Sequence, residues 1–337
     1  MLHQATLTNF GPLGEIHWPN LGPINLVIGD NGSGKTFLLK ALYAAIRTVE
    51  EYRRGDDPRS AADILAQKLY WTFQPEKIGD LVAKGGDGQL SLSVDLDGGE
   101  FRFAFGKDTA KQISTLENQT RPRTSNSIFL PAKEVLSLHH LILKSREREH
   151  SFGFDDTYLD LARALRPLPR TGNGDPSFSA PRKRLEELIG GKVEYDEPSG
   201  RWQFRKGNRK YPIGVTAEGI KKIAIFETLL ENGYIDGQSL VFVDEPEAAL
   251  HPSAISRLLD MTAMLAETGI QFFLASHSYF VVKKLFLIAR EKEMSIPVLS
   301  LGDGTGNCAD LKDGLPENTI IDESIRLYKE EVELALQ

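Results

Sequence analysis

Short, nearly continuous apolar runs that end in polar residues recur along the chain. They cover residues 24–28 (INLVI), 239–243 (SLVFV) and 271–275 (QFFLA), and a further run at 127–131 (SIFLP) resembles them. Runs of this length and composition are typical of strands that are covered on both faces. The pattern therefore predicts the strands of a buried, mostly parallel sheet.

Two other periodicities predict the elements around this sheet. Strict alternation predicts antiparallel hairpins over residues 89–105 and 192–204, with turns at 97–99 and 198–200. Spacing of three and four residues between apolar positions predicts helices. These helices are expected over residues 37–47, 157–165, 181–189 and 217–232, from just after 277 to about 293, and from about 322 onward. A Gly-, Pro- and Ser-rich stretch at 167–181 predicts a loop, and a Gly-rich turn is expected after residue 301.

The loop after the first apolar run carries candidate chemistry. Its residues are Gly29, Asp30, Asn31, Gly32, Ser33, Gly34, Lys35 and Thr36, which fit the phosphate-binding pattern G-x-x-x-x-G-K-[ST]. Glycines let several backbone N–H groups point at phosphate oxygens, and the helix that follows adds its positive N-terminal end. We expect Lys35 to reach the β- and γ-phosphates of ATP and Thr36 to bind Mg²⁺. A chance glycine-rich loop is the alternative, but it leaves the strand before and the helix after unexplained.

Polar residues also close the other two apolar runs. Asp244 and Glu245 follow the 239–243 run, and His277 follows the 271–275 run. Carboxyl ends of parallel strands open onto one ligand crevice, so these side chains should meet the glycine-rich loop. Asp244 is expected to hold Mg²⁺ together with Thr36, and Glu245 to orient or deprotonate the attacking water. His277 is expected beside the γ-phosphate, although a single histidine in a sequence is more often structural.

In this order the three motifs resemble those of the ABC-type P-loop ATPases. The segment EPEAALHP at residues 245–252 is similar to the DEPExxLHP segment of the branch that contains SMC, RecF and OLD proteins. The opening LTNFG at 7–11 also looks like the N-terminal hairpin of that branch. The resemblance implies an α/β fold, with a mostly parallel sheet, an antiparallel β-layer and a small helical insertion. We expect an N-terminal lobe over 1–134, the insertion over 135–190 and a C-terminal lobe over 191–337.

The signature sequence of the family is degenerate in this chain. ABC ATPases carry an LSGGQ-like motif that binds the γ-phosphate held by the opposite subunit, and the best match here is VTAEG at residues 215–219. Thr216 is expected to cap the following helix and, with Gly219, to contact the partner's nucleotide. An ordinary helix cap is the alternative reading of the same residues. Glu218 stands where the family has glycine. Lys221 or Lys222 is expected to pair with it, and Lys222, four residues on, is well placed to do so.

The glutamine of the family's Q-loop is also uncertain. Gln74 lies at a plausible distance after the glycine-rich loop and would then reach the Mg²⁺ site, but its stretch fits a helical lid contact equally well. The run at 127–131 ends in a loop from which Lys133 or Glu134 could face the site.

Composition limits the setting of this chemistry. One cysteine, Cys308, excludes an internal disulfide and suits a reducing cytoplasm. There is no secretory leader and no apolar run of the roughly 20 residues needed to cross a bilayer, so we expect a cytoplasmic protein without direct membrane insertion. The net charge of −7 gives no general nucleic-acid signal. The basic run 201–210 could bind nucleic acid, although a hairpin with solvated charges explains it better.

The resemblance implies Mg²⁺-dependent ATP hydrolysis that drives a head-to-tail homodimer or a higher homo-oligomer. Such a switch would gate a separate effector, a nuclease or a toxin, or act on DNA, in anti-phage defence, a toxin-type operon or DNA repair. The energising subunit of a membrane transporter and an ATP-sensing scaffold are the alternatives. The segment 245–252 and the degenerate signature disfavour the first, and the intact catalytic motifs disfavour the second. We expect neither a long coiled coil nor an appended nuclease domain.

Overall fold

A sheet of six strands forms the centre of the part of the chain that the computed structural model describes, residues 1–84, 88–166 and 178–336. Its strand order is β14-β13-β3-β12-β11-β7, and every neighbouring pair is parallel except β13 and β14. The strands are β3 (Ile24–Gly29), β7 (Ile128–Leu130), β11 (Leu240–Asp244), β12 (Gln271–Ser276), β13 (Pro297–Gly302) and β14 (Thr305–Asp310). The predicted α/β fold with a mostly parallel sheet is therefore confirmed.

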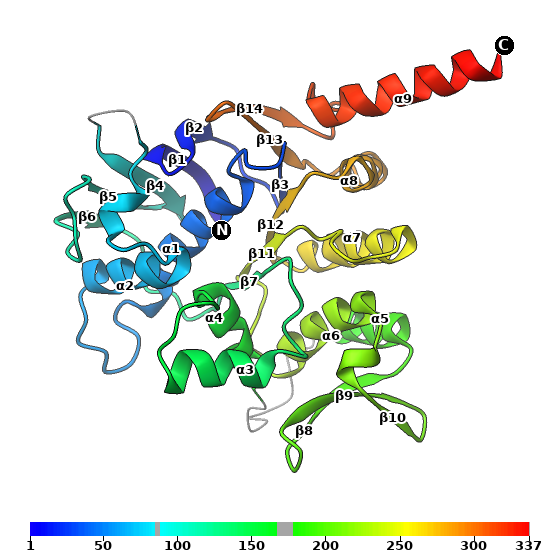
Figure 1. The fold of residues 1–337 in the computed structure, drawn as a ribbon, viewed down its shortest axis with the longest axis horizontal. Helices are drawn as coiled ribbons and strands as arrows, with labels where there is room; N and C mark the ends of the chain where they lie inside the picture. Colours follow the sequence, from blue (N-terminus) through cyan, green and yellow to red (C-terminus); the bar gives the residue numbers. More distant parts are fainter. Residues whose placement is uncertain (85–87, 167–177, 337) are drawn as a thin grey trace.

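Both faces of this sheet are covered, which explains the continuous apolar runs. Val27, Phe242 and Phe273 point to one face and pack with α1 (Lys35–Glu51) and with the antiparallel sheet. Their neighbours Leu26 and Val243 point to the other face, into a core that is shared with four helices. These are α5 (Ser179–Ile189), α6 (Glu218–Glu231), α7 (Pro252–Ala266) and α8 (Tyr279–Glu291). Figure 1 shows these layers, with the antiparallel sheet on the left and the helices on the right. Because alternate side chains enter two different cores, both faces of β3 and β11 are lined mainly by apolar residues. Asn25, the buried polar residue within β3, donates to the carbonyl groups of Gly22 and Phe272.

The antiparallel sheet has the order β2-β1-β4-β5-β6. The predicted hairpin at 89–105 is confirmed as β4–β5, whereas β6 was not foreseen. The strands are β1 (Leu2–Phe10), β2 (Leu13–Trp18), β4 (Leu90–Leu96), β5 (Gly99–Phe105) and β6 (Thr115–Asn118). Helix α2 (Ala61–Phe73) packs on α1 and begins with a capping box between Ser60 and Asp63. A 3₁₀ turn, η1 (Ile78–Leu81), follows α2.

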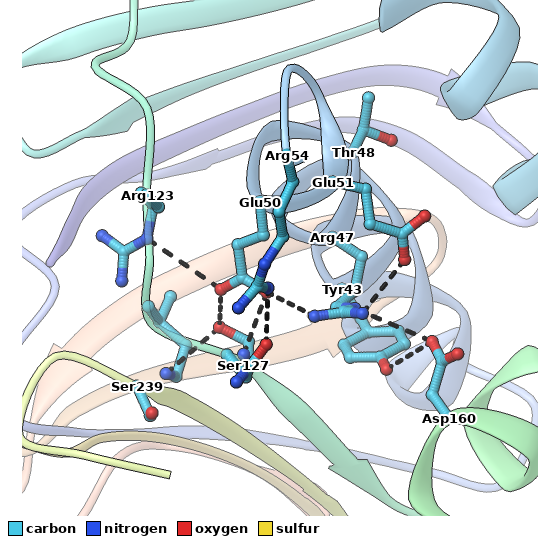
Figure 2. A network of polar contacts seen from close by, with 12 residues as sticks. Tyr43, Arg47, Thr48, Glu50, Glu51, Arg54, Arg123, Ser127, Asp160 and Ser239 are labelled. Atoms are coloured by element: carbon cyan, nitrogen blue, oxygen red, sulfur yellow. Dashed lines mark hydrogen bonds and ion pairs between the residues drawn. The ribbon is translucent and has the colours of Figure 1, made fainter. Parts of the chain in front are cut away.

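Buried polar contacts hold the C-terminal half of α1 against the core (Figure 2). Glu50 accepts hydrogen bonds from the amide and hydroxyl of Ser127 at 2.9 and 2.5 Å, and from the guanidinium of Arg47. The Ser127 hydroxyl in turn accepts from the amide of Leu240, the first residue of β11. Tyr43 donates to Asp160 of α4 (Asp156–Ala164). Glu50 therefore links the helix behind the glycine-rich loop to the start of both β7 and β11.

The remaining elements lie on the other side of the central sheet. They are α3 (His139–Leu143), the π-helical turn η2 (Lys144–Arg148), α5 (Ser179–Ile189), the 3₁₀ turn η4 (Ile213–Val215), α6 (Glu218–Glu231), α7 (Pro252–Ala266), α8 (Tyr279–Glu291) and α9 (Thr319–Ala335). A small antiparallel sheet, β10-β9-β8, joins α5 to η4 and consists of β8 (Lys192–Asp196), β9 (Arg201–Lys206) and β10 (Arg209–Pro212). Most of the loop predicted at 167–181 lies outside the described residues.

Two local expectations change, and a third is confirmed. The Gly-rich turn after residue 301 continues into β14, because the chain pairs back on β13. The last helix begins at Thr319 rather than near 322, since Asn318 accepts from the amide of Ile320 and caps it. The basic run 201–210 forms β9 and β10, with Trp202 and Phe204 buried as the hairpin prediction required. Among the described helices, none has the length and apolar character of a membrane span.

Candidate functional site

The glycine-rich loop connects β3 to α1 and has backbone angles that other residues resist. Gly29 and Gly34 have φ of 151° and 96°. A Cβ atom would lie 2.5 Å from the Leu301 carbonyl oxygen at Gly29 and 2.6 Å from the Leu13 side chain at Gly34. Both positions therefore require glycine, on grounds of strain and of space. The buried hydroxyl of Ser33 has no hydrogen-bond partner within the described residues, as expected of a group that is set for a ligand.

Lys35 folds back over this loop. Its ammonium donates to the carbonyl oxygens of Gly29 and Asp30, each at 2.8 Å. Burial lowers the pKa of Lys35, and the nearby carboxylates of Glu245 and Asp244 oppose that shift. The Lys35 ammonium thus lies at the carboxyl end of β3, close enough to Asp244 and Glu245 to interact with their charges.

Thr36 and Asp244 meet directly. The threonine hydroxyl lies 2.9 and 3.0 Å from the two oxygens of the aspartate carboxylate. Burial raises the pKa of Asp244 to about 6, against the stabilising hydrogen bond from Thr36. A buried carboxylate whose charged form is disfavoured in this way gains from a nearby cation.

These two groups fit a magnesium ion that takes its other ligands from a nucleotide. Within the described ranges, no cluster of three or more histidine, cysteine or acidic side chains could hold a metal by itself. Mg²⁺ is commonly bound through only one or two carboxylates, together with substrate phosphates and water. A hydroxyl and a carboxylate beside a phosphate-binding loop match that donor set.

Glu245 and His277 lie side by side at the ends of β11 and β12. The imidazole Nδ1 is 3.5 Å from Glu245 Oε1 and 3.7 Å from Glu247 Oε1. Glu245 has a φ of 46°, and its amide donates to the Ala275 carbonyl, which sets the direction of its side chain. Both side chains are partly exposed, so water and a ligand can reach them.

Glu247 supports this pair, a task that the sequence did not suggest. Its Oε1 accepts from the Ser276 hydroxyl at 2.7 Å and from the His277 amide at 3.3 Å. Its other oxygen is buried and has no partner among the described residues. Glu247 thereby ties the loop after β11 to the end of β12.

Within the described residues, the hydrogen bonds of Gln74 do not reach this site. It ends α2 in the left-handed conformation, with a φ of 54°. Its amide group donates to the Phe154 carbonyl at 3.1 Å, and its oxygen accepts weakly from the Gly153 amide at 3.4 Å. The helical contact, which was the alternative for this stretch, describes what Gln74 does here. Its role toward a metal remains an untested prediction.

Other residues approach Asp244 from the segment after β7 and from α4. The carboxyl end of β7 lies beside β11 and is followed by Lys133. Burial raises the pKa of Tyr158 to about 12, and Asp155 and Asp244 add to that shift. Asp155 also accepts from the ammonium of Lys40, at 2.6 Å, one turn after the glycine-rich loop. The sequence did not predict that Tyr158 and Asp155 lie near the site, because only the tertiary packing of α4 brings them there.

The degenerate signature differs in detail from its prediction. Helix α6 begins at Glu218, and Ala217 occupies the cap position without a side-chain bond. The Thr216 hydroxyl turns back to the Pro212 carbonyl at 3.5 Å, so the prediction that Thr216 caps the helix is wrong. Gly219 lies in the first turn, where a Cβ would come 3.1 Å from the Ala254 Cβ.

Of the two lysines expected as partners of Glu218, the nearer one makes the pair. The Glu218 carboxylate accepts from Lys221 at 2.8 Å. Lys222, the partner favoured by spacing, points instead to the loop after β11. Glu218 pairs with the lysine three residues away, because the ammonium of Lys222 is bonded to carbonyl groups of that loop.

Comparison with known proteins gives both a family and a fold. The model of a family described as "AAA domain, putative AbiEii toxin, Type IV TA system" matches residues 24–283. An SMC head bound to the C-terminal winged-helix domain of ScpA is similar over 92% of this chain and 97% of its own, with 13% identity and a TM-score of 0.54. A Pyrococcus furiosus Smc head with an extended coiled coil, bound to the C-terminal domain of ScpA, is similar over 98% of each chain, with 13% identity and a TM-score of 0.50. No curated protein matches the sequence.

Proposed function

The chain belongs to this family of AAA domains, and from that premise we propose that it binds ATP with Mg²⁺ at residues 29–36 and hydrolyses it. One observation carries the proposal. Three strands from distant parts of the sequence deliver Lys35, Thr36, Asp244, Glu245 and His277 to one end of the central sheet. Cation, hydroxyl, carboxylates and imidazole at one sheet edge are the groups that phosphoryl transfer to water requires.

Each group then has a separate task in hydrolysis. Backbone N–H groups of the loop and the Lys35 ammonium would bind the phosphates, after the ammonium leaves the carbonyls of Gly29 and Asp30. Bound Mg²⁺ would neutralise charge on the phosphate oxygens, held by Thr36 and Asp244. Glu245 would accept a proton from the attacking water, and His277 would donate a hydrogen bond toward the γ-phosphate. Positioning and charge neutralisation supply most of the rate in such reactions.

We further propose that two chains associate head to tail around the nucleotide. The loop 29–36 contacts phosphates from one side only, so a second surface would complete the site. The segment before α6 supports this idea, because Val215 is 74% exposed and Ala217 is exposed as well. Backbone N–H groups at the start of α6 are free to meet an anion.

The same ATPase would control a separate effector. The family description names a toxin and a type IV toxin–antitoxin system, and two similar structures are SMC heads bound to a second protein. Both support a switch that passes its state to a partner. DNA as the direct target has less support, since the net charge is −7 and two of the basic residues at 201–210, Arg205 and Lys210, pair with Glu194.

Phosphate release from purified protein tests the core of the proposal. ATP and Mg²⁺ should give steady turnover that EDTA stops and that Lys35→Ala abolishes. Turnover that survives Lys35→Ala would point to a contaminating ATPase and would contradict the proposal. For the effector, the product of a neighbouring gene should be assayed with wild-type protein and with Lys35→Ala, and only the former should change its activity.

A further inference from the structure

The side chain of Lys222 binds the backbone of the loop after β11. The Lys222 ammonium lies 3.3 Å from the carbonyl oxygens of Glu245 and Pro246 and 3.1 Å from that of Ala248. Lys222 belongs to the second turn of α6, so this contact joins two segments that are far apart in the sequence. The three carbonyls converge on a single donor.

The shape of this loop explains why it needs such a donor. Glu245 and Ala249 are both non-glycine residues in the left-handed region, with φ of 46° and 59°. Strain of this kind costs on the order of 1–3 kcal/mol for each residue and persists only where surrounding contacts impose it. The turn directs its carbonyl groups inward, where each requires a hydrogen-bond donor.

Lys222 has no ionic partner that would account for its place. In residues 1–84, 88–166 and 178–336, no carboxylate lies within ion-pair distance of its ammonium, whereas its neighbour Lys221 pairs with Glu218 at 2.8 Å. Burial lowers the pKa of Lys222, and the more distant charges of Glu247, Glu218, Glu245 and Asp244 counteract that shift. A partly buried cation whose hydrogen bonds within the described residues all go to carbonyl groups is costly, which indicates that the contact with the loop is the role of this side chain.

We propose that Lys222 is a positioning residue that holds the loop 245–249 in the strained conformation in which the Glu245 carboxylate faces His277. The inference rests on the proposed function, because hydrolysis is the reaction in which the place of Glu245 matters. Displacement of a reacting group by about 1 Å can lower a rate on the order of 100-fold. Loss of the three contacts would free the loop and misplace the carboxylate without touching the phosphate-binding loop.

Hydrogen exchange in nucleotide-free protein tests the contact without any activity. Lys222→Met keeps the length of the side chain and removes its donors. A peptide that spans residues 245–250 should then exchange about tenfold faster or more, the effect of losing hydrogen bonds worth about 1.4 kcal/mol. Peptides from β12 should not change. Lys221→Met, which removes the neighbouring and more deeply buried lysine from the same helix, is the control and should leave the loop protected.

Steady-state kinetics test the consequence. Lys222→Met should lower kcat for ATP at least about tenfold while KM stays within about twofold, and Lys222→Arg should recover most of the loss. Lys221→Met should keep the wild-type kcat. If Lys222→Met melts below the assay temperature, Lys222→Gln, which keeps a shorter donor, should give smaller changes in the same directions.

The outcomes separate the two proposals. Wild-type exchange in the loop together with wild-type kcat, in either Lys222→Met or Lys222→Gln, overturns the positioning role. A kcat loss that Lys221→Met shares equally overturns it too, because a general destabilisation of α6 would then explain both. If the wild-type protein shows no hydrolysis at all, the proposed function fails, while the exchange result still decides whether Lys222 holds the loop.

Discussion

The hydroxyl of Thr36 donates to both oxygens of the Asp244 carboxylate, across 208 positions of sequence. This contact joins the first turn of α1 to the end of β11. It also occupies the two groups that would bind Mg²⁺ in the proposed function. To hold the metal with its nucleotide, Thr36 and Asp244 would have to give up this hydrogen bond, and the nucleotide affinity should report that change.

Thr36→Val should weaken ATP binding only in the presence of Mg²⁺. The valine keeps the shape of threonine but offers no ligand, and interactions with a charged group are worth about 1.5–3 kcal/mol, so the affinity for MgATP should fall on the order of 10- to 100-fold. Titration calorimetry with Mg²⁺ and with EDTA measures both affinities. Thr48→Val in the same helix, whose hydroxyl donates only to the Ala44 carbonyl, is the control. An equal loss with and without Mg²⁺ would argue against a metal-binding role.

Lys35→Ala should abolish detectable ATP binding and leave the fold intact. Among the described residues the ammonium donates to its own loop, to Gly29 and Asp30, so its removal breaks no described hydrogen bond between elements. Calorimetry and circular dichroism check the two statements. Lys206→Ala, an exposed lysine of β9, should bind ATP normally. Full-strength binding by Lys35→Ala would remove the glycine-rich loop from the proposed site.

Glu245→Gln should retain ATP binding and lose turnover at least about tenfold, the lower range for loss of a general base. The amide keeps the size of the side chain and can still contact His277, whose Nδ1 lies 3.5 Å away in the wild type. Phosphate release measures the rate, and calorimetry measures the binding. Unchanged turnover would exclude Glu245 as the base and would leave His277 or another residue in that role.

The strand ends of the site could be predicted, because a strand buried on both faces is apolar along its length and the first polar residues mark where it ends. Asp244 is the first polar position after one such run, and Ser276 and His277 are the first two after another, so the meeting of Asp244 and His277 at one sheet edge follows from the parallel order of the strands. The fold class and the β4–β5 hairpin follow from periodicity in the same way. The start of α6 was predicted less accurately. Thr216 was expected to cap this helix, whereas it ends the 3₁₀ turn η4 and Ala217 takes the cap position.

Contacts that depend on tertiary packing could not be predicted. Helical spacing favoured a pair between Lys222 and Glu218, but the loop after β11 offers three carbonyl oxygens that no pattern in the sequence reveals. Gln74 was placed near the metal by its distance along the chain, whereas its amide is bonded to the residues before α4. In both cases the choice of partner is made by the arrangement of elements, not by the local sequence.

Glu227→Gln should stabilise the protein at alkaline pH and not at acidic pH. Burial among α5, α6 and β8, with repulsion from Glu231, raises the pKa of Glu227 to about 7, and neither carboxylate oxygen has a hydrogen-bond partner in the described residues. The folded state therefore binds this proton more tightly than the unfolded state does. The free energy of unfolding should fall as the pH rises from about 4.5 to above 7, and the glutamine removes that loss.

Thermal denaturation at pH 5 and pH 8 measures this effect. We expect a gain of about 1–3 kcal/mol for Glu227→Gln at pH 8, which shrinks toward zero at pH 5. Glu187→Gln, at an exposed position of α5, should change the stability little at either pH. A gain of the same size at both pH values would mean that packing, not the charge, limits the stability at this position.

Association that depends on ATP is the remaining test of the head-to-tail arrangement. The Glu245→Gln protein, which should trap the nucleotide, is expected to sediment as at least a dimer with ATP and Mg²⁺ and as a smaller species without them. The surface that would complete the site precedes α6. Thr216 is buried and bonded to Pro212, so an arginine there would disturb the fold. Ala217 is exposed at the helix start and is the better position for a bulky charge.

Ala217→Arg, added to Glu245→Gln, should therefore block the association and leave ATP binding unchanged. The guanidinium would fill the space in front of the free N–H groups of α6, where the partner's γ-phosphate is expected. Asn208→Arg, on the exposed turn between β9 and β10, adds the same charge away from that surface and should still allow the dimer. If the mass does not depend on nucleotide in any of these proteins, the segment 215–219 is only the start of a helix. Any oligomer then forms through another surface, and a site completed by a second chain is ruled out.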